Sequence, residues 1–172
     1  MSVAPTDLAA IEVQEISLPH FTTTTAWELG TRLRERLLPR AGLISISLAN
    51  SHPLTNVVFQ CVTAPGITPD HETWVARKRA TVLRFGHSTW YMRNKFPGME
   101  PGEQDRAFAE KYMMGEEERH RYAIHGGGFP IKVKGVDAIV GVIVVSGLAQ
   151  TEDHQIIADT LAEYVKELEA RK

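Results

Sequence analysis

The sequence predicts an α+β domain in which helices cover an antiparallel sheet. The predicted elements follow the order helix, strand, helix, strand, strand, helices, strand, strand, helix, which favours antiparallel neighbours over a doubly wound parallel sheet. Residues 44–48, Ile-Ser-Ile-Ser-Leu, alternate between apolar and polar side chains, as in a strand with one buried face. Near the C-terminus a turn around Gly135 and Asp137 separates two apolar, β-branched segments, which is typical of a hairpin.

The N-terminal residues predict a weak helix, a short strand and a longer helix. Residues 6–15 are weakly helical, and residues 16–18 could begin a strand. Thr25 and Glu28 have the spacing of a capping box, which satisfies two backbone N–H groups at a helix start. We therefore expect the longer helix to begin at Thr25 and to end at Pro39, which cannot continue a helix.

Two paired strands follow this helix. Residues 44–48 form the first, residues 56–62 form the second, and turn-forming residues 50–53 join them. The lone Cys61 lies in the second strand, so we expect a buried, inert thiol rather than a nucleophile.

The middle of the chain predicts a long helix and a shorter one. Thr68 followed by Pro69 has the pattern of an N-cap and a first helical residue. This helix should end near Phe85, because Gly86 can adopt the left-handed conformation of a C-cap. Ser88 is then the expected N-cap of the shorter helix.

The last third of the chain predicts a charged helix, the hairpin and a final helix. The charged helix covers about residues 103–114. The hairpin strands are residues 129–134 and 139–145, and the second should be central in the sheet because both of its faces are apolar. Thr151 is the expected N-cap of the final helix. The buried stripe of that helix is formed by Ile157, Leu161, Tyr164 and Leu168.

Composition predicts one domain over residues 1–172 and excludes several classes of protein. With 19 Lys and Arg against 21 Asp and Glu, the net charge of −2 argues against nucleic-acid binding driven by bulk charge. The longest apolar run, residues 138–145, is too short to span a membrane. One cysteine cannot form an internal disulfide, and the N-terminus lacks the basic and apolar regions of a secretory signal, so we expect a cytoplasmic protein.

A cationic face on the long middle helix is the most informative pattern. Arg77, Thr81, Arg84 and Ser88 are spaced so that a helix places them on one side. Residues 71–95 contain six Lys and Arg against one Glu, a local charge of +5 in a chain of net charge −2. Such a face could hold carboxylates or phosphates through charge-assisted hydrogen bonds.

A structural role for the same arginines is an open alternative. They could form ion pairs with the acidic stretches at residues 100–118 and 152–169, within or between subunits. The opposite side of the helix carries Trp74, Lys78 and Val82, and Lys78 is the one charge in an otherwise apolar stripe. Trp27, Trp74 and Trp90 are expected to be packing residues or subunit contacts.

A glycine run, His125-Gly126-Gly127-Gly128, precedes the first hairpin strand. Glycines tolerate positive φ and let backbone N–H groups approach a ligand closely, but they also permit a tight bend between strands. Both explanations stay open at this point. The run is neither a P-loop nor a dinucleotide fingerprint, because a strand follows it rather than a helix.

No motif for a metal site or a nucleophile stands out. Seven histidines are present, yet no two have His-x-x-x-His spacing and none belongs to a Cys-His cluster, so we expect no dedicated metal site. The histidines could still ligate a haem iron or exchange protons near neutral pH. The Gly-x-Ser-x-Gly motif is absent, and Ser88 beside His87 could find a catalytic base only in three dimensions.

Three segments, residues 74–92, 122–131 and 146–154, together resemble the uncharacterised cytosolic branch of the haem-degrading-domain superfamily, the GlcG/HbpS-like proteins. The resemblance covers roughly residues 20–168. It implies a profilin-like fold with an antiparallel five-stranded sheet between helical layers (α/β/α), and homo-oligomers built from dimers. The superfamily's His-Gly-Gly-x-Pro element is longer here, since Gly128 and Phe129 separate Gly127 from Pro130.

The first functional hypothesis is a protein that binds a small anionic ligand, with haem as one candidate cofactor. The cations would take a propionate or another carboxylate, a histidine would be the axial ligand of a haem iron, and the glycine backbone would close the pocket. The ligand-binding residues in this hypothesis are Arg77, Lys78, Thr81, Arg84, His87, Ser88, His125, Gly126 and Gly127.

Two alternatives belong to other functional classes. In one, the protein is an oligomeric scaffold or adaptor that recruits another protein through the face from Arg77 to Arg84 and the acidic C-terminal helix. In the other, it is an enzyme that degrades haem or uses His125 as an acid or base near Arg84. No motif in the sequence demands either alternative.

Overall fold

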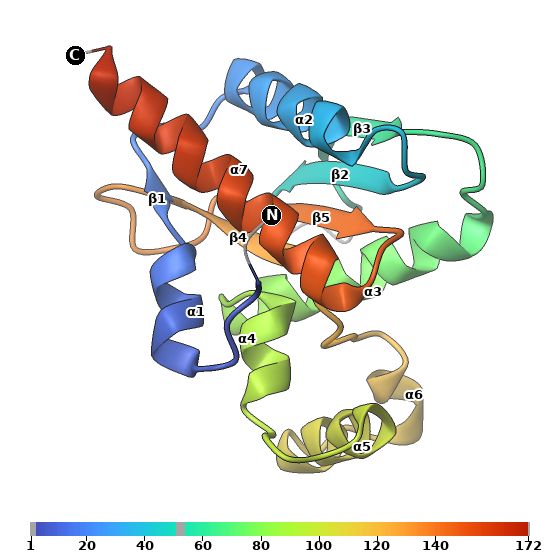
Figure 1. Ribbon diagram of the computed structural model, residues 1–172. Helices are drawn as coiled ribbons and strands as arrows, with labels where there is room; N and C mark the ends of the chain where they lie inside the picture. The colour runs from blue at the N-terminus through green and yellow to red at the C-terminus, as the bar shows by residue number, and fades with distance from the viewer. Residues whose placement is uncertain (1–2, 51–53, 172) are drawn as a thin grey trace.

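A five-stranded mixed sheet organises the computed structural model, which describes residues 3–50 and 54–171 (Figure 1). The strand order is β1-β4-β5-β2-β3, and β5 is central, as expected, with all six of its residues buried. The strands are β1 (Ser17–Leu18), β2 (Leu43–Leu48), β3 (Val57–Val62), β4 (Gly128–Val133) and β5 (Gly141–Ser146).

The prediction of a purely antiparallel sheet is wrong at one edge. The pairs β2–β3, β2–β5 and β4–β5 are antiparallel, whereas β1 pairs with β4 in parallel. No hairpin joins β1 to β4, because α2, β2, β3 and four further helices lie between them in the chain. Local turn geometry therefore does not impose an antiparallel direction on β1. Of the predicted turn at residues 50–53, residues 51–53 lie outside the described part of the chain.

The correctly predicted helix boundaries are those at which the expected capping residue caps the helix in the structure. Thr68 and Gly86 flank the long middle helix as expected, and Gly86 has a φ of 70°. Ser88 caps the next helix by accepting a hydrogen bond from the Tyr91 N–H. The helices are α1 (Leu8–Gln14), α2 (Thr23–Leu37), α3 (Pro69–Phe85), α4 (Thr89–Asn94), α5 (Pro101–Lys111), α6 (Glu116–Arg119) and α7 (Gln150–Ala170).

Two predicted N-caps are wrong. The capping box of α2 joins Thr22 to Thr25, one turn before the predicted pair, and Glu28 instead accepts a hydrogen bond of 2.6 Å from the Tyr164 hydroxyl. Four consecutive threonines made the cap ambiguous in the sequence. The N-cap of α7 is Ala149 rather than Thr151. The short α6 was not predicted, because its four residues are all charged and show no apolar residues at helical spacing.

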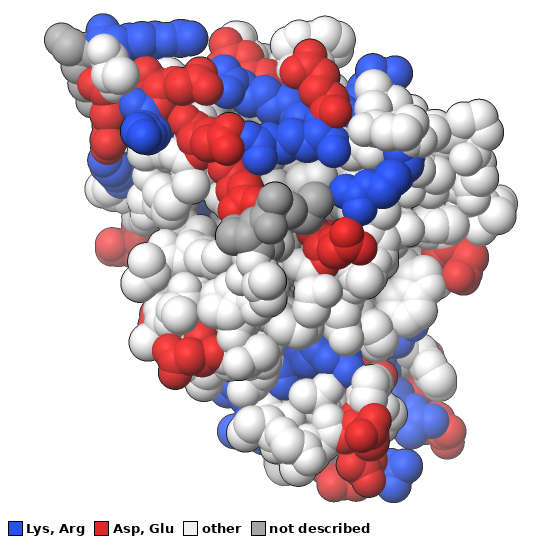
Figure 2. Space-filling view, in the orientation of Figure 1, with Lys and Arg blue, Asp and Glu red and all other residues white. Residues whose placement is uncertain are grey.

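Helices cover both faces of the sheet, which gives the expected three layers (Figure 1). On one face α2 and α7 enclose the larger core, in which Leu29, Phe129 and Ile157 are fully buried. On the other face α3 packs on β4 and β5 through a smaller core that contains Val75 and Val82. Figure 2 shows acidic and basic side chains interleaved where α7 runs beside α2, in agreement with ion pairs from α2 to Glu163 and Glu167.

The helices α4, α5 and α6 form a smaller unit at one end of α3 (Figure 1). An aromatic cluster holds it together, with Phe85 in contact with Phe108, Tyr112 and Tyr122. Among the described residues, no helix is long and apolar enough to cross a membrane.

The three tryptophans have different environments. Trp90 is buried and donates from its indole N–H to the Pro5 carbonyl. Trp27 is 64% exposed and packs edge-on against Phe59, and Trp74 lies at the wall of a cavity.

Cys61 is only half-buried, and burial raises the pKa of its thiol.

Candidate functional site

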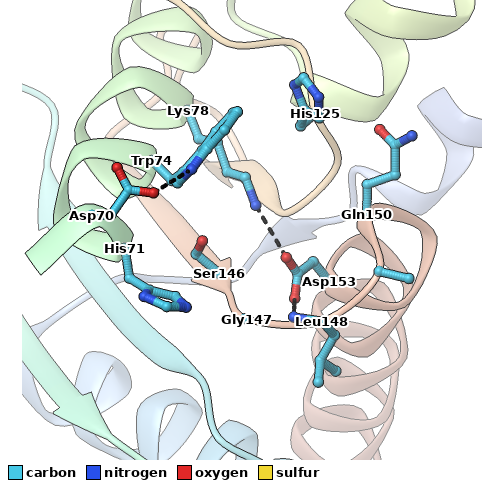
Figure 3. Close-up of a pocket in the computed structure, with 11 residues that line it drawn as sticks. Asp70, His71, Trp74, Lys78, His125, Ser146, Gly147, Leu148, Gln150 and Asp153 are labelled. Carbon is cyan, nitrogen blue, oxygen red and sulfur yellow. Dashed lines mark hydrogen bonds and ion pairs between the residues drawn. The ribbon is translucent and has the colours of Figure 1, made fainter. Parts of the chain in front are cut away.

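A cavity of about 500 Å³ lies between α3, the end of β5 and the start of α7 (Figure 3). We call it the α3–α7 cavity. Its volume is within the range of pockets that take small organic molecules. It is lined by Asp70, His71, Trp74 and Lys78 of α3, by His125, and by Ser146, Gly147, Leu148, Ala149, Gln150 and Asp153 at the β5–α7 junction.

A buried ion pair forms the base of the cavity. Lys78 Nζ lies 3.1 Å from Asp153 Oδ2 and also donates to the Val145 carbonyl, while Asp153 Oδ1 accepts from the Leu148 N–H (Figure 3). Burial lowers the pKa of Lys78 and raises the pKa of Asp153, although each partner partly offsets this effect on the other. The pair thereby fixes the loop that leads into α7.

The N-terminus of α7 opens into the cavity without a side-chain cap. Its N-cap is Ala149, whose methyl group cannot accept the hydrogen bonds of the first N–H groups. Both acidic residues of the first turn have cationic partners, since Glu152 pairs with Arg40 and Asp153 with Lys78. The positive end of this 21-residue helix is therefore not offset by a free carboxylate in its first turn.

Two buried polar atoms in the residues that line the cavity have no hydrogen-bond partner. They are Nδ1 of His125 and Oε1 of Gln150. The His125 ring packs edge-on against Trp74, with ring centroids 4.9 Å apart, and burial lowers the pKa of the imidazole. Buried polar atoms in native proteins are rarely left unpartnered, so these two are consistent with a polar ligand or water in the cavity.

The glycines of the run at residues 125–128 allow close packing of protein against protein. A Cβ on Gly126 would lie 2.1 Å from the Gln150 carbonyl oxygen. Gly127 has a φ of 113°, and a Cβ there would lie 2.4 Å from the carbonyl oxygen of Val145. Both glycines thus bring the start of β4 against the β5–α7 junction, and the nearest atom to each added Cβ would be a backbone oxygen.

Of the nine predicted ligand-binding residues, Lys78 and His125 line the α3–α7 cavity. Arg77 does not line this cavity, although its guanidinium lies 4.8 Å from the Trp74 indole centroid. Thr81 is buried, and its hydroxyl exchanges hydrogen bonds with the backbone of Ala123.

The remaining predicted residues outside the glycine run lie elsewhere. Arg84 pairs with Glu118 at the surface, which agrees with the structural alternative for the basic helix face. His87 and Ser88 contact the buried Glu15, whose carboxylate also pairs with Lys132. Burial alone would raise the pKa of Glu15, but these hydrogen bonds together lower it. The basic face is therefore covered by segments from other parts of the chain rather than gathered in one pocket.

Sequence reasoning missed most of the wall formed by the β5–α7 junction. Asp153 lies in the acidic stretch at residues 152–169, and it shares with Ser146 and Gln150 the segment that carries the family resemblance. Asp70 and His71 follow the predicted helix start at Thr68 and Pro69, and His71 completes a capping box with Thr68.

The residues that line the α3–α7 cavity do not fit haem. Its two acids are Asp70 and Asp153, and its single cation, Lys78, is already paired, so nothing balances two propionates. Trp74 is its only large apolar side chain besides Leu148, whereas a porphyrin needs extensive apolar contact. Within the described residues, no group of three His, Cys, Asp or Glu side chains could hold a metal ion.

Comparisons with known proteins agree with this architecture. The model of a family described as "Haem degrading protein HbpS-like" matches residues 21–162. A UPF0303 protein of Psychromonas ingrahamii is 34% identical over 155 residues, which cover 90% of this chain and 89% of the relative. A UPF0303 protein of Streptomyces avermitilis is 33% identical over 163 residues, covering 94% and 92%.

Solved structures are also similar. The crystal structure of the Ybr137w protein is 31% identical, with a TM-score of 0.80, and the match covers 94% of this chain and 88% of that one. The crystal structure of HbpS matches with a TM-score of 0.59 at 18% identity over 86% of this chain and 92% of that one. At 18% identity, the second match is evidence for the fold alone.

Proposed function

This chain belongs to the HbpS-like family and is related to the UPF0303 proteins, and from the geometry of its cavity we propose that it binds a small carboxylate rather than haem. One observation carries the proposal, namely that the uncapped N-terminus of α7 opens into the α3–α7 cavity. A carboxylate placed there would accept hydrogen bonds from the free backbone N–H groups and be stabilised by the helix dipole.

The surrounding side chains support a ligand with one carboxylate and further polar groups. His125 Nδ1 and Gln150 Oε1 are unpartnered buried atoms that a polar ligand could satisfy. Asp70 is on α3, where it accepts a hydrogen bond from the Trp74 indole. Together with Asp153, Asp70 gives the cavity two acids, and these repel a ligand with several negative charges. A monocarboxylate is therefore the best match to the cavity.

The two alternatives have less support. The scaffold hypothesis relied on an open cationic surface from Arg77 to Arg84, but Arg77 donates to the Tyr122 carbonyl and Arg84 pairs with Glu118. The enzyme hypothesis needs His125 near Arg84, whereas the guanidinium of Arg84 stacks on Phe85 and Tyr122. Arg84 is therefore engaged elsewhere, and Arg77 is held against the Tyr122 backbone rather than on an open surface.

Homo-oligomers built from dimers and a cytoplasmic location remain part of the proposal. The edge strand β3 supports self-association, because Val57 and Val62 are exposed and β3 has no partner on its outer side among the described residues. Trp27 lies beside this edge in contact with Phe59. Exposed apolar side chains beside an open strand edge are typical of an interaction surface.

A carboxylate titration with two matched variants tests the function. The probes are acetate, lactate, succinate and citrate, and binding is measured by calorimetry and by the shift in melting temperature. Ala149→Asp places a carboxylate at the N-cap, so it should stabilise the protein by about 1 kcal/mol and abolish binding of the probe. Thr151→Asp adds the same charge to the first turn, outside the cavity lining, and should keep most of the binding.

Two outcomes would reject the proposal. One is that no probe binds the wild type at millimolar concentration, and the other is that Ala149→Asp binds as tightly as the wild type. A haem titration followed by visible absorption tests separately whether haem is the ligand. A saturable, shifted Soret band that His125→Ala abolishes would restore haem as the ligand.

A further inference from the structure

A second cavity, which we call the α5–α6 cavity, lies between α3, α5 and α6 and has the opposite charge balance. We propose that it binds a phosphate group, as free phosphate or as the phosphomonoester of a small metabolite. Its volume is about 300 Å³. The charged and polar side chains that line it are those of Arg77, Asp105, Arg106, Arg119, His120 and Tyr122.

Arg77 is held in a fixed orientation at this cavity. Its Nε donates to the Tyr122 carbonyl oxygen at 3.1 Å, and its guanidinium carbon lies 4.8 Å from the centre of the Trp74 indole. No hydrogen bond of its two terminal nitrogens is found within residues 3–50 and 54–171. A guanidinium fixed in this way loses little conformational entropy when it binds an anion.

The other two arginines are also free to bind an anion. Arg119 forms one surface ion pair, with Glu116 at 3.2 Å, in which its own side chain is 48% exposed and the glutamate is more exposed still. Such a pair contributes little and is readily exchanged. Arg106 is exposed, and its guanidinium has no ion pair in the described part of the chain.

The negative charge of Asp105, the single acid among the lining residues, is offset by the buried Arg93. Asp105 Oδ1 lies 4.0 Å from Nη1 of Arg93, a side chain that is only 3% exposed and whose Nη1 has no hydrogen bond. Arg93 is not part of the cavity lining, so its charge offsets that of Asp105 from the interior. The three lining arginines therefore leave a strong local excess of positive charge, in a chain whose net charge is −2.

This charge and geometry favour phosphate over a monocarboxylate. Guanidinium groups bind phosphate oxygens through paired hydrogen bonds, and a dianion gains more than a monoanion from several converging cations. His120 can add a further donor through a ring N–H. Figure 2 shows a group of basic side chains between α5 and the body of the molecule, with acidic and basic side chains mixed on and below α5.

The site has a different lining from the carboxylate site of the proposed function. The α3–α7 cavity contains two acids and one paired lysine, and none of its lining residues also lines the α5–α6 cavity. The Trp74 indole contacts a residue of each cavity, His125 of the α3–α7 cavity and Arg77 of the α5–α6 cavity. Binding at one site can therefore fail while binding at the other persists.

Calorimetric titration of the full chain tests the inference with three probes. Inorganic phosphate and AMP are the two sources of the phosphate group, and succinate is a dianion without phosphorus. The variant Arg106→Glu should weaken phosphate binding by about tenfold or more, because it replaces a phosphate donor with a repelling charge. Arg121→Glu is the matched control, since Arg121 is exposed just after the lining residues Arg119 and His120 but does not itself line the cavity.

The outcomes separate specific binding from attraction by net charge. Loss of phosphate binding in Arg106→Glu, with retention in Arg121→Glu and in Ala149→Asp, supports the site. A tighter response to AMP than to free phosphate would identify a phosphomonoester as the ligand, and the reverse would identify free phosphate. Equal weakening in both glutamate variants, preference for succinate, or no binding to the wild type would each overturn the proposal.

Discussion

Lys78 Nζ and Asp153 Oδ2 lie 3.1 Å apart with their side chains only 4% and 3% exposed, and this contact joins the middle of α3 to the first turn of α7. The same carboxylate accepts the Leu148 N–H, and the same ammonium donates to the Val145 carbonyl. The pair therefore holds β5, α7 and the loop between them in the arrangement that creates the α3–α7 cavity. Its contribution to stability depends on both charges being present, because desolvation of each charge is costly.

Removal of one member of this pair should destabilise the protein strongly. Lys78→Met leaves a buried carboxylate without its counter-charge and should lower the free energy of unfolding by about 3–5 kcal/mol. Urea denaturation measures the loss. The double variant Lys78→Met/Asp153→Asn should recover much of it, because the amide oxygen can still accept from Leu148 without a buried charge.

An exposed pair provides the control for that cycle. Arg32→Met breaks the ion pair with Glu167 at the surface of α2 and should cost less than about 1 kcal/mol. If Lys78→Met costs no more than Arg32→Met, the buried pair does not have the structural role assigned to it.

The strands and most helix boundaries could be predicted because their signals are local. Alternation at residues 44–48, the caps at Thr68 and Ser88, and the C-cap at Gly86 are set by residues a few positions apart. The parallel pairing of β1 was not predictable in this way, since β4 lies far along the chain.

The site was harder to predict, because it depends on contacts between distant residues. Periodicity correctly placed Arg77, Thr81 and Arg84 on one side of a helix. It could not indicate that Ala123 and Tyr122 would pack over that side and take up its hydrogen bonds. Lys78 was apparent as a charge in an apolar stripe, but its partner, Asp153, is 75 residues away.

The buried His154 should make stability depend on pH. Burial lowers the pKa of this imidazole to about 4, and its Nε2 lies 2.9 Å from Gln14 Oε1. The unfolded chain takes up this proton near pH 6.5, so between pH 6.5 and about 4 the unfolded state binds more protons than the folded state. Stability is therefore retained above pH 6.5 and lost as the pH falls toward 4, by about 3 kcal/mol in total.

The comparison of the wild type with His154→Gln isolates this contribution. Glutamine does not titrate, so the difference in unfolding free energy, wild type minus variant, should fall by about 2 kcal/mol between pH 7 and pH 5. Urea denaturation at intervals of half a pH unit measures it, and values at pH 8 provide the baseline. A difference that stays constant across this range would contradict a neutral, buried imidazole in the folded state.

Gly126 should be intolerant of even one methyl group, because its neighbour is backbone rather than a movable side chain. A Cβ there would lie 2.1 Å from the Gln150 carbonyl oxygen and 3.3 Å from the Trp90 ring. Gly126→Ala should therefore lower the free energy of unfolding by about 1–3 kcal/mol and push the start of α7 outward. Carboxylate binding should weaken with it, since the first N–H groups of α7 would move relative to Lys78 and His125.

Gly102→Ala is the matched control, because Gly102 lies in the first turn of α5 with no atom within 4 Å of the added carbon. That variant should be neutral or stabilising by up to about 1 kcal/mol, since alanine favours helix over glycine. Equal stability of the two variants would mean that β4 and α7 can separate without loss, and the close approach at Gly126 would then not be what holds the cavity in shape.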